Sequence, residues 1–240
     1  MKGMILAAGY GTRLKPLTND KPKALVEFNG KTMLEHVITK FIDAGIEEII
    51  INVHHFASEI YRFLSLNDNF GIDIQISDER DELLNTGGGI RKALWFFQDD
   101  EPFIVHNVDV VSNISLADLT EHHKHTGALA TLALKHRETS RYFLVNSAGD
   151  ICGWRNKATG KEIISKKNYT DELAFSCIQV IHPALFKLTD KRGVFSITDA
   201  YLELAGEHKI NGFVTDNAYW FDLGTPEKIQ QAATHILARS

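Results

Sequence analysis

A glycine-rich loop followed by basic residues is the feature of this sequence with the clearest chemical meaning. The apolar run at residues 4–8 predicts a buried strand that leads directly into Gly9-Tyr10-Gly11-Thr12. The two glycines allow backbone N–H groups to approach a ligand closely. Arg13, Lys21 and Lys23 follow shortly after the loop. A strand, a glycine loop and closely spaced cations together predict a polyphosphate site.

Two familiar phosphate-binding motifs do not match this loop. The dinucleotide fingerprint requires a third glycine where this chain has Leu14. The P-loop requires Gly-Lys-Ser/Thr at its end, and that tripeptide is absent. The full string, Leu-Ala-Ala-Gly-x-Gly-Thr-Arg-Leu followed by Pro-Leu-Thr and Lys-Pro-Lys, is far more demanding than a glycine pair that only makes a tight turn.

Two aspartates, distant in sequence, are each expected at the end of a strand. Asp109 follows the apolar run 103–106, and Asp222 follows the run 219–221. Mg²⁺ in proteins typically takes one or two carboxylates together with phosphate oxygens and water. The pair therefore fits a magnesium site at the edge of a sheet.

These residues resemble one family, the sugar-1-phosphate nucleotidyltransferases, also called nucleotide-sugar pyrophosphorylases. Further landmarks are Asn85-Thr-Gly-Gly-Gly-Ile90, Phe175-Ser-Cys-Ile178 and Trp220-Phe-Asp-Leu-Gly-Thr-Pro226. Within the family, the chain looks most like the short N-acetylmuramate-1-phosphate uridylyltransferases and the mannose-1-phosphate guanylyltransferase-like proteins. The resemblance implies transfer of a nucleoside monophosphate from a nucleoside triphosphate to a sugar-1-phosphate, with release of pyrophosphate.

The resemblance also implies a role for each matching residue. Arg13 and Lys23 act on the phosphates: the planar fork of Arg13 suits the β- and γ-phosphates, and the compact cation of Lys23 suits the sugar phosphate and the α-phosphate. Asp109 and Asp222 bind Mg²⁺. The expected nucleotide-binding residues are Leu6, Ala7, Ala8, Gly9, Gly11, Thr12, Ser77, Thr86, Gly87 and Gly88, and the expected sugar-phosphate residues are Asn107 and Ser176.

Three departures from the family pattern stand out. Val108 precedes Asp109 where relatives usually carry glycine, and Cys177 stands where relatives usually carry glycine next to the sugar. The Glu-Lys-Pro string that many relatives use to hold sugar hydroxyls is absent, and residues 154–157, which lie in that neighbourhood, are the candidates to substitute for it. Because valine cannot take a positive φ cheaply, Val108→Gly tests whether the family geometry has shifted here. We expect this change not to reduce activity.

The order of expected elements predicts an α/β chain with a Rossmann-like, mainly parallel sheet flanked by helices, the nucleotide-diphospho-sugar transferase fold. Residues 142–154 predict a small β-hairpin flap beside the site, and residues 1–240 are expected to form a single nucleotidyltransferase domain. Thr32, Thr86 and Thr225 are expected helix caps. The expected strands are 48–53, 72–76, 103–106 and 129–134, and the expected helices are 32–44, 58–66, 90–97, 116–125 and 226–238.

Composition narrows the class of protein. The net charge of −5 argues against a nucleic-acid partner, and no stretch of eighteen apolar residues suggests a membrane span. The two cysteines predict no disulfide framework and favour a cytoplasmic location. The histidines of segment 121–125 match no zinc spacing and are expected on a solvated helix face. An oligomer is possible.

Two other functions stay open at this point. The first is a phosphocholine cytidylyltransferase of the same fold, which needs an aromatic and acidic cage for a quaternary ammonium, to which Tyr142, Trp154 and Tyr169 could contribute. The second is a catalytically weak nucleotide-binding regulatory protein, supported only by Val108. The sequence does not decide which sugar or which base is used.

Overall fold

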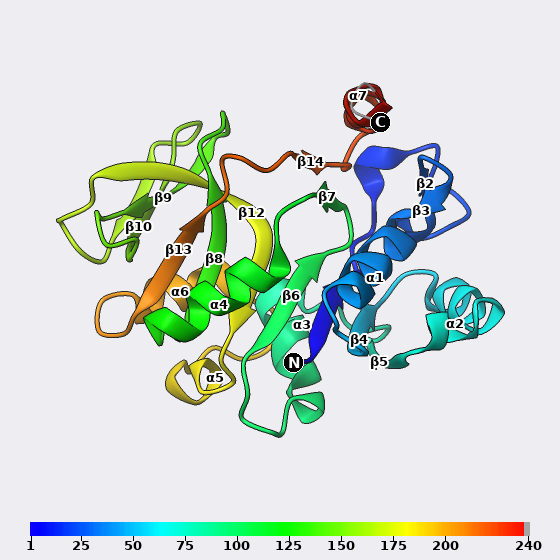
Figure 1. Cartoon of the computed structure of the whole chain (residues 1–240), viewed down its shortest axis with the longest axis horizontal. Helices are drawn as coiled ribbons and strands as arrows, with labels where there is room; N and C mark the ends of the chain where they lie inside the picture. Colours follow the sequence, from blue (N-terminus) through cyan, green and yellow to red (C-terminus); the bar gives the residue numbers. More distant parts are fainter. Residues whose placement is uncertain (238–240) are drawn as a thin grey trace. The chain divides into compact units, whose positions relative to one another are not determined.

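The computed structural model describes residues 1–237, which form two compact units (Figure 1). The N-terminal unit comprises residues 2–83, 106–113 and those from 219 onward, and the central unit comprises Met1 with residues 84–105 and 114–218. Strand β6 (Phe103–Asn107) gives its first three residues to the central unit and its last two to the N-terminal unit. Whether the chain acts as a single domain stays a prediction.

A parallel sheet of three strands carries the N-terminal unit. Strand β4 pairs with β1 on one side and with β5 on the other, so that Leu6, Asn52 and Ser77 lie in one row across the sheet. β4 is buried after its first residue, as expected for a continuous apolar strand covered on both faces. The strands are β1 (Gly3–Leu6), β4 (Glu48–Val53) and β5 (Asp73–Asp78).

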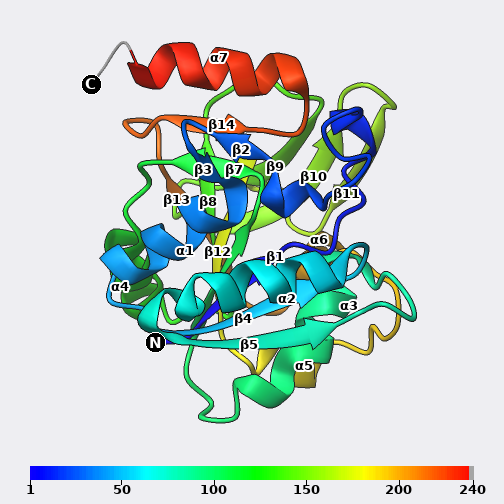
Figure 2. The ribbon, with the colours of Figure 1, turned by 90° about the vertical axis from the view of Figure 1, so that its right-hand side faces the viewer.

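Helices and two short ribbons complete this unit. Thr32 caps α1 by accepting a hydrogen bond from the Glu35 amide at 3.1 Å, so the expected cap at Thr32 is confirmed. Helix α7 packs along β14 (Figure 2). The elements are β2 (Glu27–Phe28), β3 (Lys31–Thr32), α1 (Met33–Asp43), α2 (Ala57–Leu66), β7 (Val110–Ser112), β14 (Trp220–Asp222), α7 (Pro226–Leu237) and the 3₁₀ turns η1 (Thr12–Leu14), η2 (Lys23–Leu25) and η3 (Asp68–Gly71).

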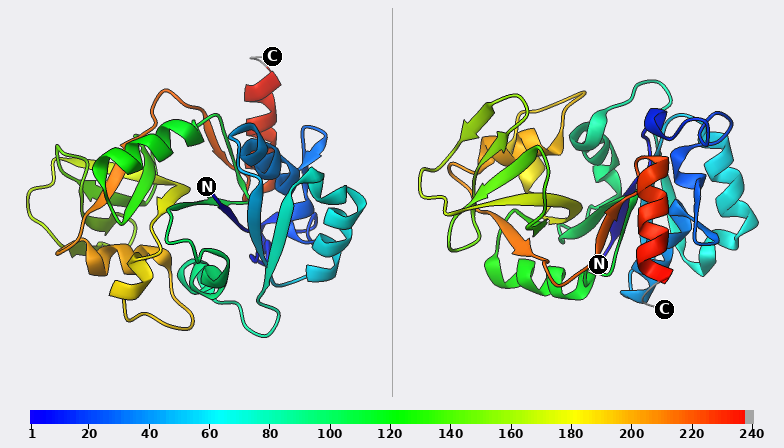
Figure 3. Two further views of the ribbon diagram at one scale, coloured as in Figure 1. Left: turned by 60° about the horizontal axis from the view of Figure 1, so that its bottom comes forward. Right: turned by 90° about the horizontal axis from the view of Figure 1, so that it is seen from above.

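The central unit is built on a mixed sheet. Strands β11, β10, β9 and β12 pair in that order, all antiparallel, and β8 joins β12 to β13. Both views of Figure 3 show the yellow-green hairpin beside the yellow strand β12. The elements are α3 (Asn85–Lys92), η4 (Ala93–Phe96), α4 (Leu116–Thr126), β8 (Ala130–Lys135), β9 (Arg141–Val145), β10 (Ile151–Asn156), β11 (Lys161–Ile164), β12 (Asp171–Ile181), α5 (Leu185–Leu188), α6 (Ile197–Leu204) and β13 (Ile210–Val214).

The predicted fold class, an α/β chain with a mostly parallel Rossmann-like sheet flanked by helices, is confirmed. The expected hairpin is present as β9 and β10, and its role as a flap stays a prediction. The C-terminal helix begins at Pro226 as expected, with the Thr225 hydroxyl accepting from the Lys228 amide at 3.4 Å. Its expected end at Ala238 lies outside the described residues. No helix in the described part of the chain is long and apolar enough to cross a membrane.

The expectation that segment 121–125 forms a solvated face is wrong for one residue. His123 is only 3% exposed, and its Nδ1 is hydrogen-bonded to the Thr131 hydroxyl at 2.9 Å. Burial lowers the pKa of His123 to about 4, so the ring is neutral near neutral pH. The residues next to His123 in the sequence are polar, so the local pattern does not indicate that one side of α4 packs against β8.

Lys135 and His136 hold the segment that follows β13 in place through hydrogen bonds. Lys135 donates to three backbone carbonyls, those of Thr215, Asp216 and Ala218, at 2.6 to 3.2 Å. The two ring nitrogens of His136 meet Asp216 Oδ2 at 2.6 Å and Asp171 Oδ2 at 2.9 Å. These two hydrogen bonds hold the pKa of His136 above its usual value.

We therefore expect part of the stability of the chain to depend on pH through His136. A raised folded-state pKa stabilises the protein fully below the unfolded value of about 6.5, and this contribution disappears as the pH rises through the folded value. Because all three side chains are about half exposed, the effect should be about 1 kcal/mol or less. Urea unfolding of the wild type and of His136→Gln should show a stability difference at pH 5.5 that shrinks at pH 8.5. Equal differences at both pH values would contradict this expectation.

Candidate active site

The glycine loop lies at the carboxyl end of β1 and beside Lys23. Gly9 is open, with no heavy atom within 4 Å of a Cβ added to it. Gly11 has a φ of +64°, and a Cβ added there would lie 3.0 Å from Cβ of Lys23. The Thr18 hydroxyl donates to the Gly11 carbonyl at 2.9 Å and fixes this end of the loop. Glycine is required at position 11 by both its backbone conformation and the approach of Lys23.

Arg13 lies in η1, directly after the glycine loop, and its guanidinium lies close to Gly224. A Cβ added to Gly224 would lie 2.8 Å from Nη2 of Arg13 and 2.7 Å from Oδ1 of Asp222. The guanidinium and the carboxylate therefore both crowd over Gly224, which explains the glycine after Asp222 and Leu223. The amide of Gly224 donates to Asp222 Oδ1 at 2.8 Å and holds that carboxylate in place.

The two expected metal ligands lie close together at one end of a two-stranded ribbon, with Asp222 in the ribbon and Asp109 just before it. Asp222 is the last residue of β14 and pairs with Val110 of β7, the residue after Asp109. The Leu223 amide donates to the Asp109 carbonyl at 2.8 Å. Asp222 thus ends a strand, as expected, but that strand belongs to the β7–β14 ribbon, whereas Asp109 follows β6.

Each carboxylate faces a lysine. Lys23 Nζ is in an ion pair with Asp109 Oδ2, and these two side chains are only 12% and 17% exposed. Lys228 Nζ lies 2.5 Å from Asp222 Oδ2. Burial pushes the pKa of Asp222 upward, but the ion pair with Lys228, the charge of Lys23 and the Gly224 amide outweigh it, so the pKa lies below its usual value. Asp222 is therefore ionised at neutral pH.

We call Arg13, Lys23, Asp109, Asp222 and Lys228 the charged cluster. Its three cations exceed its two carboxylates, which favours a polyanionic ligand beside the open glycine loop. Its two carboxylate side chains, Asp109 and Asp222, also suit Mg²⁺, which needs few protein ligands when phosphates supply the rest. Among the described residues, no group of three or more His, Cys, Asp or Glu side chains could hold a metal ion alone.

Lys228 is a member of the cluster that the sequence reasoning missed. It stands in the first turn of α7, where a lysine is unfavourable because the helix dipole is positive there. A cation in that position indicates a nearby carboxylate, and Asp222 lies just before the helix. The position of Lys228 in the first turn of a helix, six residues after Asp222, was therefore the feature of the sequence that could have indicated its role.

Other predicted residues of the N-terminal unit lie around the loop with different exposure. Leu6 accepts a hydrogen bond from the Val108 amide at 3.1 Å, and Ala7 donates to Asn52 Oδ1 at 2.7 Å. Ala8 is buried, Thr12 is exposed and Asn107 is half-buried at the end of β6. Ser77 is 3% exposed, and its hydroxyl has no hydrogen-bond partner within the described protein.

The expectation that Thr86 caps a helix is wrong. Helix α3 starts at Asn85 and has Leu84 at its N-cap, without a side-chain cap. The Thr86 hydroxyl instead accepts from the Ile197 amide at 3.0 Å, at the start of α6. This pairing joins two segments distant in sequence, so local cap signals could not indicate it.

Gly87 and Gly88 allow close packing inside the central unit. A Cβ on Gly87 would lie 2.3 Å from the Phe195 ring, and one on Gly88 would lie 2.2 Å from the Gly193 carbonyl oxygen. Their amides donate to the Phe195 carbonyl at 2.9 and 3.3 Å. The charged cluster is built entirely from the N-terminal unit, whereas Thr86, Gly87, Gly88 and Ser176 belong to the central unit.

Strand β12 carries an irregularity next to Ser176. Ser176 is fully buried, and the pairing of β12 with β8 shifts register between Phe175 and Gln179. Cys177 lies inside this bulge with a φ of +59°, a conformation that glycine adopts at lower cost than cysteine. The backbone at this position is therefore one that suits the glycine usual in the family, although the residue is cysteine.

The side chains expected to replace the missing Glu-Lys-Pro string are held in ion pairs. Arg155 contacts Glu172 and lies 2.5 Å from Glu162 Oε1, and Lys157 Nζ lies 2.7 Å from Glu172 Oε2. The hydrogen bond from Lys157 is the largest effect on the pKa of Glu172 and lowers it. Burial acts in the opposite direction, but the charge of Arg155 adds to the effect of Lys157, so the pKa lies below its usual value. A role of segment 154–157 toward a sugar stays a prediction.

Val108 does not need the conformational freedom of glycine. Its φ is not positive, its side chain is 3% exposed, and its amide is bound to the Leu6 carbonyl. We expect Val108→Gly to leave turnover within about threefold of the wild type, because the Asp109 backbone is held by Leu223.

The same change should lower the free energy of unfolding by about 1.5–3 kcal/mol through lost burial of the valine side chain. Turnover and a urea midpoint, measured on the same preparation, check both parts. A tenfold gain in turnover, about 1.4 kcal/mol, would show that valine displaces Asp109. A marked loss in a folded variant would show that valine contacts the substrate.

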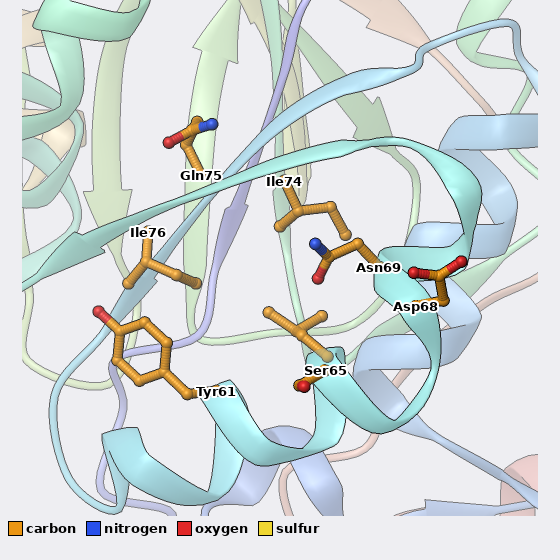
Figure 4. A pocket seen from close by; sticks show the side chains of 8 residues that line it. Tyr61, Ser65, Asp68, Asn69, Ile74, Gln75 and Ile76 are labelled. Atoms are coloured by element: carbon orange, nitrogen blue, oxygen red, sulfur yellow. The ribbon is translucent and has the colours of Figure 1, made fainter.

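A separate pocket of about 510 Å³ lies between α2 and β5 (Figure 4). Tyr61 and Ser65 come from α2, Asp68 and Asn69 from η3, and residues 74–76 from β5, with Gln75 pointing away from its neighbours Ile74 and Ile76. The lining contains no basic side chain, so this pocket does not suit a polyphosphate.

Comparisons with known proteins show the family and the fold of this chain. The sequence profile of the family described as nucleotidyl transferase matches residues 2–239. A mannose-1-phosphate guanyltransferase of Yarrowia lipolytica is 32% identical over 231 residues, which cover 95% of this chain and 61% of that protein. An N-acetylmuramate alpha-1-phosphate uridylyltransferase of Caulobacter vibrioides is 44% identical over 110 residues, 45% of this chain and 45% of that protein.

A solved structure shows the same fold. A putative glucose-1-phosphate thymidylyltransferase from Bacillus anthracis superposes with a TM-score of 0.79 at 21% identity, covering 100% of this chain and 96% of that one. The chain spans about three fifths of the length of the guanyltransferase above, so that protein contains sequence without a counterpart here. The profile match extends over nearly the whole chain, and the chain therefore belongs to the nucleotidyl transferase family.

Proposed function

We propose that this protein transfers a nucleoside monophosphate from a nucleoside triphosphate to a sugar-1-phosphate, giving a nucleotide sugar and pyrophosphate. The observation that carries the proposal is the charged cluster beside the open glycine loop. Phosphoryl-type transfers depend mainly on positioning and on neutralisation of charge, and they need little covalent help from the protein. The cluster supplies both from side chains of a single unit.

Each member of the cluster has a proposed part in the reaction. Arg13 binds the β- and γ-phosphates with its planar fork. Lys23 offsets the repulsion between the sugar phosphate and the α-phosphate as the sugar-phosphate oxygen attacks the α-phosphorus and pyrophosphate leaves. Lys228 holds Asp222 in an ion pair and keeps its carboxylate oriented. Ala8, Gly9 and Gly11 offer backbone groups to the nucleotide.

Asp109 and Asp222 are the residues that would hold Mg²⁺. Bound there, the ion would supply positive charge against the phosphate oxygens. Lys228 and the charge of Lys23 keep the pKa of Asp222 below its usual value, so this carboxylate is ionised and available as a metal ligand.

The substrate pairs to test first come from the relatives. They are mannose-1-phosphate with GTP and N-acetylmuramate-α-1-phosphate with UTP, as named for the proteins of Yarrowia lipolytica and Caulobacter vibrioides. The proposed setting is the cytoplasm, and Cys152 and Cys177 form no disulfide with each other, which suits a reducing compartment.

A panel of nucleoside triphosphates against several sugar-1-phosphates, with pyrophosphate detection, tests the proposal. We expect release of pyrophosphate with at least one pair, dependent on both substrates. Triphosphate binding without pyrophosphate release from any pair would favour a regulatory protein that only binds nucleotide.

Choline phosphate belongs in the same panel, although the structure gives it little support. A cage for quaternary ammonium needs accessible aromatic faces. Lys157 already lies 4.4 Å from the Tyr142 ring centroid, and Arg155 lies 5.8 Å from that of Tyr169. We expect no turnover of choline phosphate.

A further inference from the structure

A buried polar pair lies directly behind the glycine loop. Asn52 interrupts the apolar strand β4 and is 3% exposed, and Glu79, just after β5, is 0% exposed. Asn52 Nδ2 donates to Glu79 Oε1 at 2.7 Å, and Asn52 Oδ1 accepts from the Ala7 amide at 2.7 Å. Burying an amide and a carboxyl group costs free energy compared with apolar residues, so their presence needs a reason.

The two hydrogen bonds of Asn52 fix its orientation. The Ala7 amide can only donate, so its acceptor must be the side-chain oxygen of Asn52. The NH₂ group of Asn52 then points to Glu79 Oε1 and donates to it. On the other side of the strand, the Leu6 carbonyl accepts from the Val108 amide. The point where β1 becomes the loop is thus held from both sides.

Glu79 also holds the far end of the loop through its main chain. His54 Nδ1 lies 2.6 Å from the Glu79 carbonyl oxygen, which can only accept, so Nδ1 carries the proton in this contact. His54 Nε2 is then free to accept from the Tyr10 hydroxyl at 3.0 Å. Both ends of segment 7–10 are therefore linked to Glu79. The Glu79 side chain is hydrogen-bonded to Asn52, which binds Ala7, and the Glu79 carbonyl is hydrogen-bonded to His54, which binds Tyr10.

We infer that Asn52 and Glu79 are positioning residues that hold the glycine loop in the shape required for nucleoside triphosphate. This inference rests on the proposed function. Transfer between two phosphates requires the reacting groups to be held within fractions of an ångström, and a glycine loop cannot hold its own shape. The buried pair provides that shape from the rigid strands behind the loop.

Reversing the polarity of the pair tests the inference. Asn52→Asp keeps an oxygen for the Ala7 amide but places a second acceptor against Glu79 Oε1. We expect this variant to bind nucleoside triphosphate about tenfold or more weakly, and to raise KM for the triphosphate much more than KM for the sugar phosphate. Asn52→Asp combined with Glu79→Gln restores one donor and one acceptor, so binding should return to within about threefold of the wild type.

Tyr201→Phe is the matched control in the central unit. The Tyr201 hydroxyl donates to Gln179 Oε1 at 2.9 Å, and both residues are buried. Its loss should lower the thermal midpoint without changing the affinity for nucleoside triphosphate. If Asn52→Asp weakens binding no more than this control does, or if the double variant does not recover, the inference is overturned.

Hydrogen exchange of segment 7–10 makes the test independent of activity. Exchange should accelerate in Asn52→Asp and slow again in the double variant, with no ligand added. If exchange changes in this way but the protein binds no nucleoside triphosphate, Asn52 and Glu79 do position the loop and the proposed function is wrong. Unchanged exchange in Asn52→Asp would overturn the positioning, whether or not the protein is active.

Discussion

Replacing Lys23 or Arg13 with alanine should lower turnover by about 100- to 1000-fold. Removing one positioned donor from a site of developing charge commonly costs about 3 kcal/mol of transition-state stabilisation. Lys23 lies beside Gly11, is ion-paired with Asp109 and lowers the pKa of Asp222 through its charge, and Arg13 lies over Gly224. Both residues thus lie close to the loop proposed to bind the phosphates.

The two alanine variants should differ in their kinetic signatures. Arg13→Ala should raise KM for the triphosphate as well as lower kcat, because its proposed contacts with the β- and γ-phosphates exist before reaction. Lys23→Ala should act mainly on kcat, because the repulsion that it offsets grows as the two anions meet. Initial rates of pyrophosphate release at varied concentrations of each substrate distinguish these patterns.

Lys21→Ala is the control for both variants, since Lys21 is exposed and lies outside the charged cluster. It should retain turnover within about threefold of the wild type. Far-UV circular dichroism is needed for Lys23→Ala in particular, because that change leaves Asp109 without its ion-pair partner. Near-normal pyrophosphate release by folded Lys23→Ala and Arg13→Ala would refute the assigned roles.

Activity should require Mg²⁺, and Asp109→Asn or Asp222→Asn should remove most of it, about 100-fold or more. An amide oxygen has nearly the shape of a carboxylate oxygen but no net charge, so it is a poorer ligand for a hard cation. The lowered pKa of Asp222 keeps its carboxylate ionised at neutral pH, and the loss should therefore not depend on modest changes of pH.

Turnover is measured with excess chelator, and then with Mg²⁺ restored stepwise for each variant. Asp20→Asn controls for removal of a carboxylate, because Asp20 is exposed and lies outside the charged cluster. If the wild type stays fully active in excess chelator, the assignment of a metal is wrong. If both aspartate variants keep wild-type turnover at low Mg²⁺, the metal binds elsewhere.

The sequence by itself determined the elements whose signals are local. The mainly apolar segment 48–53, which shows no alternation, predicted a strand, and β4 has those bounds, with every residue after Glu48 buried. Thr32 predicted the start of α1 as a side-chain cap, and α1 ends two residues before Gly45, which has a positive φ. Arg13, Lys23, Asp109 and Asp222 could be proposed because their motifs are short and specific, and the structure brings all four into one cluster.

Only the tertiary structure decided features that depend on distant partners. Three glycines in a row disfavour a helix locally, yet α3 forms there because the segment around Phe195 fills the space that side chains would need. His123 faces a strand and not solvent, and Lys228 completes the charged cluster from the start of α7. Asn52 meets Ala7 across 45 residues of sequence and Glu79 across 27. Periodicity and capping describe neighbours along the chain, whereas these contacts depend on which strands and helices pack together, and that is set by the fold as a whole.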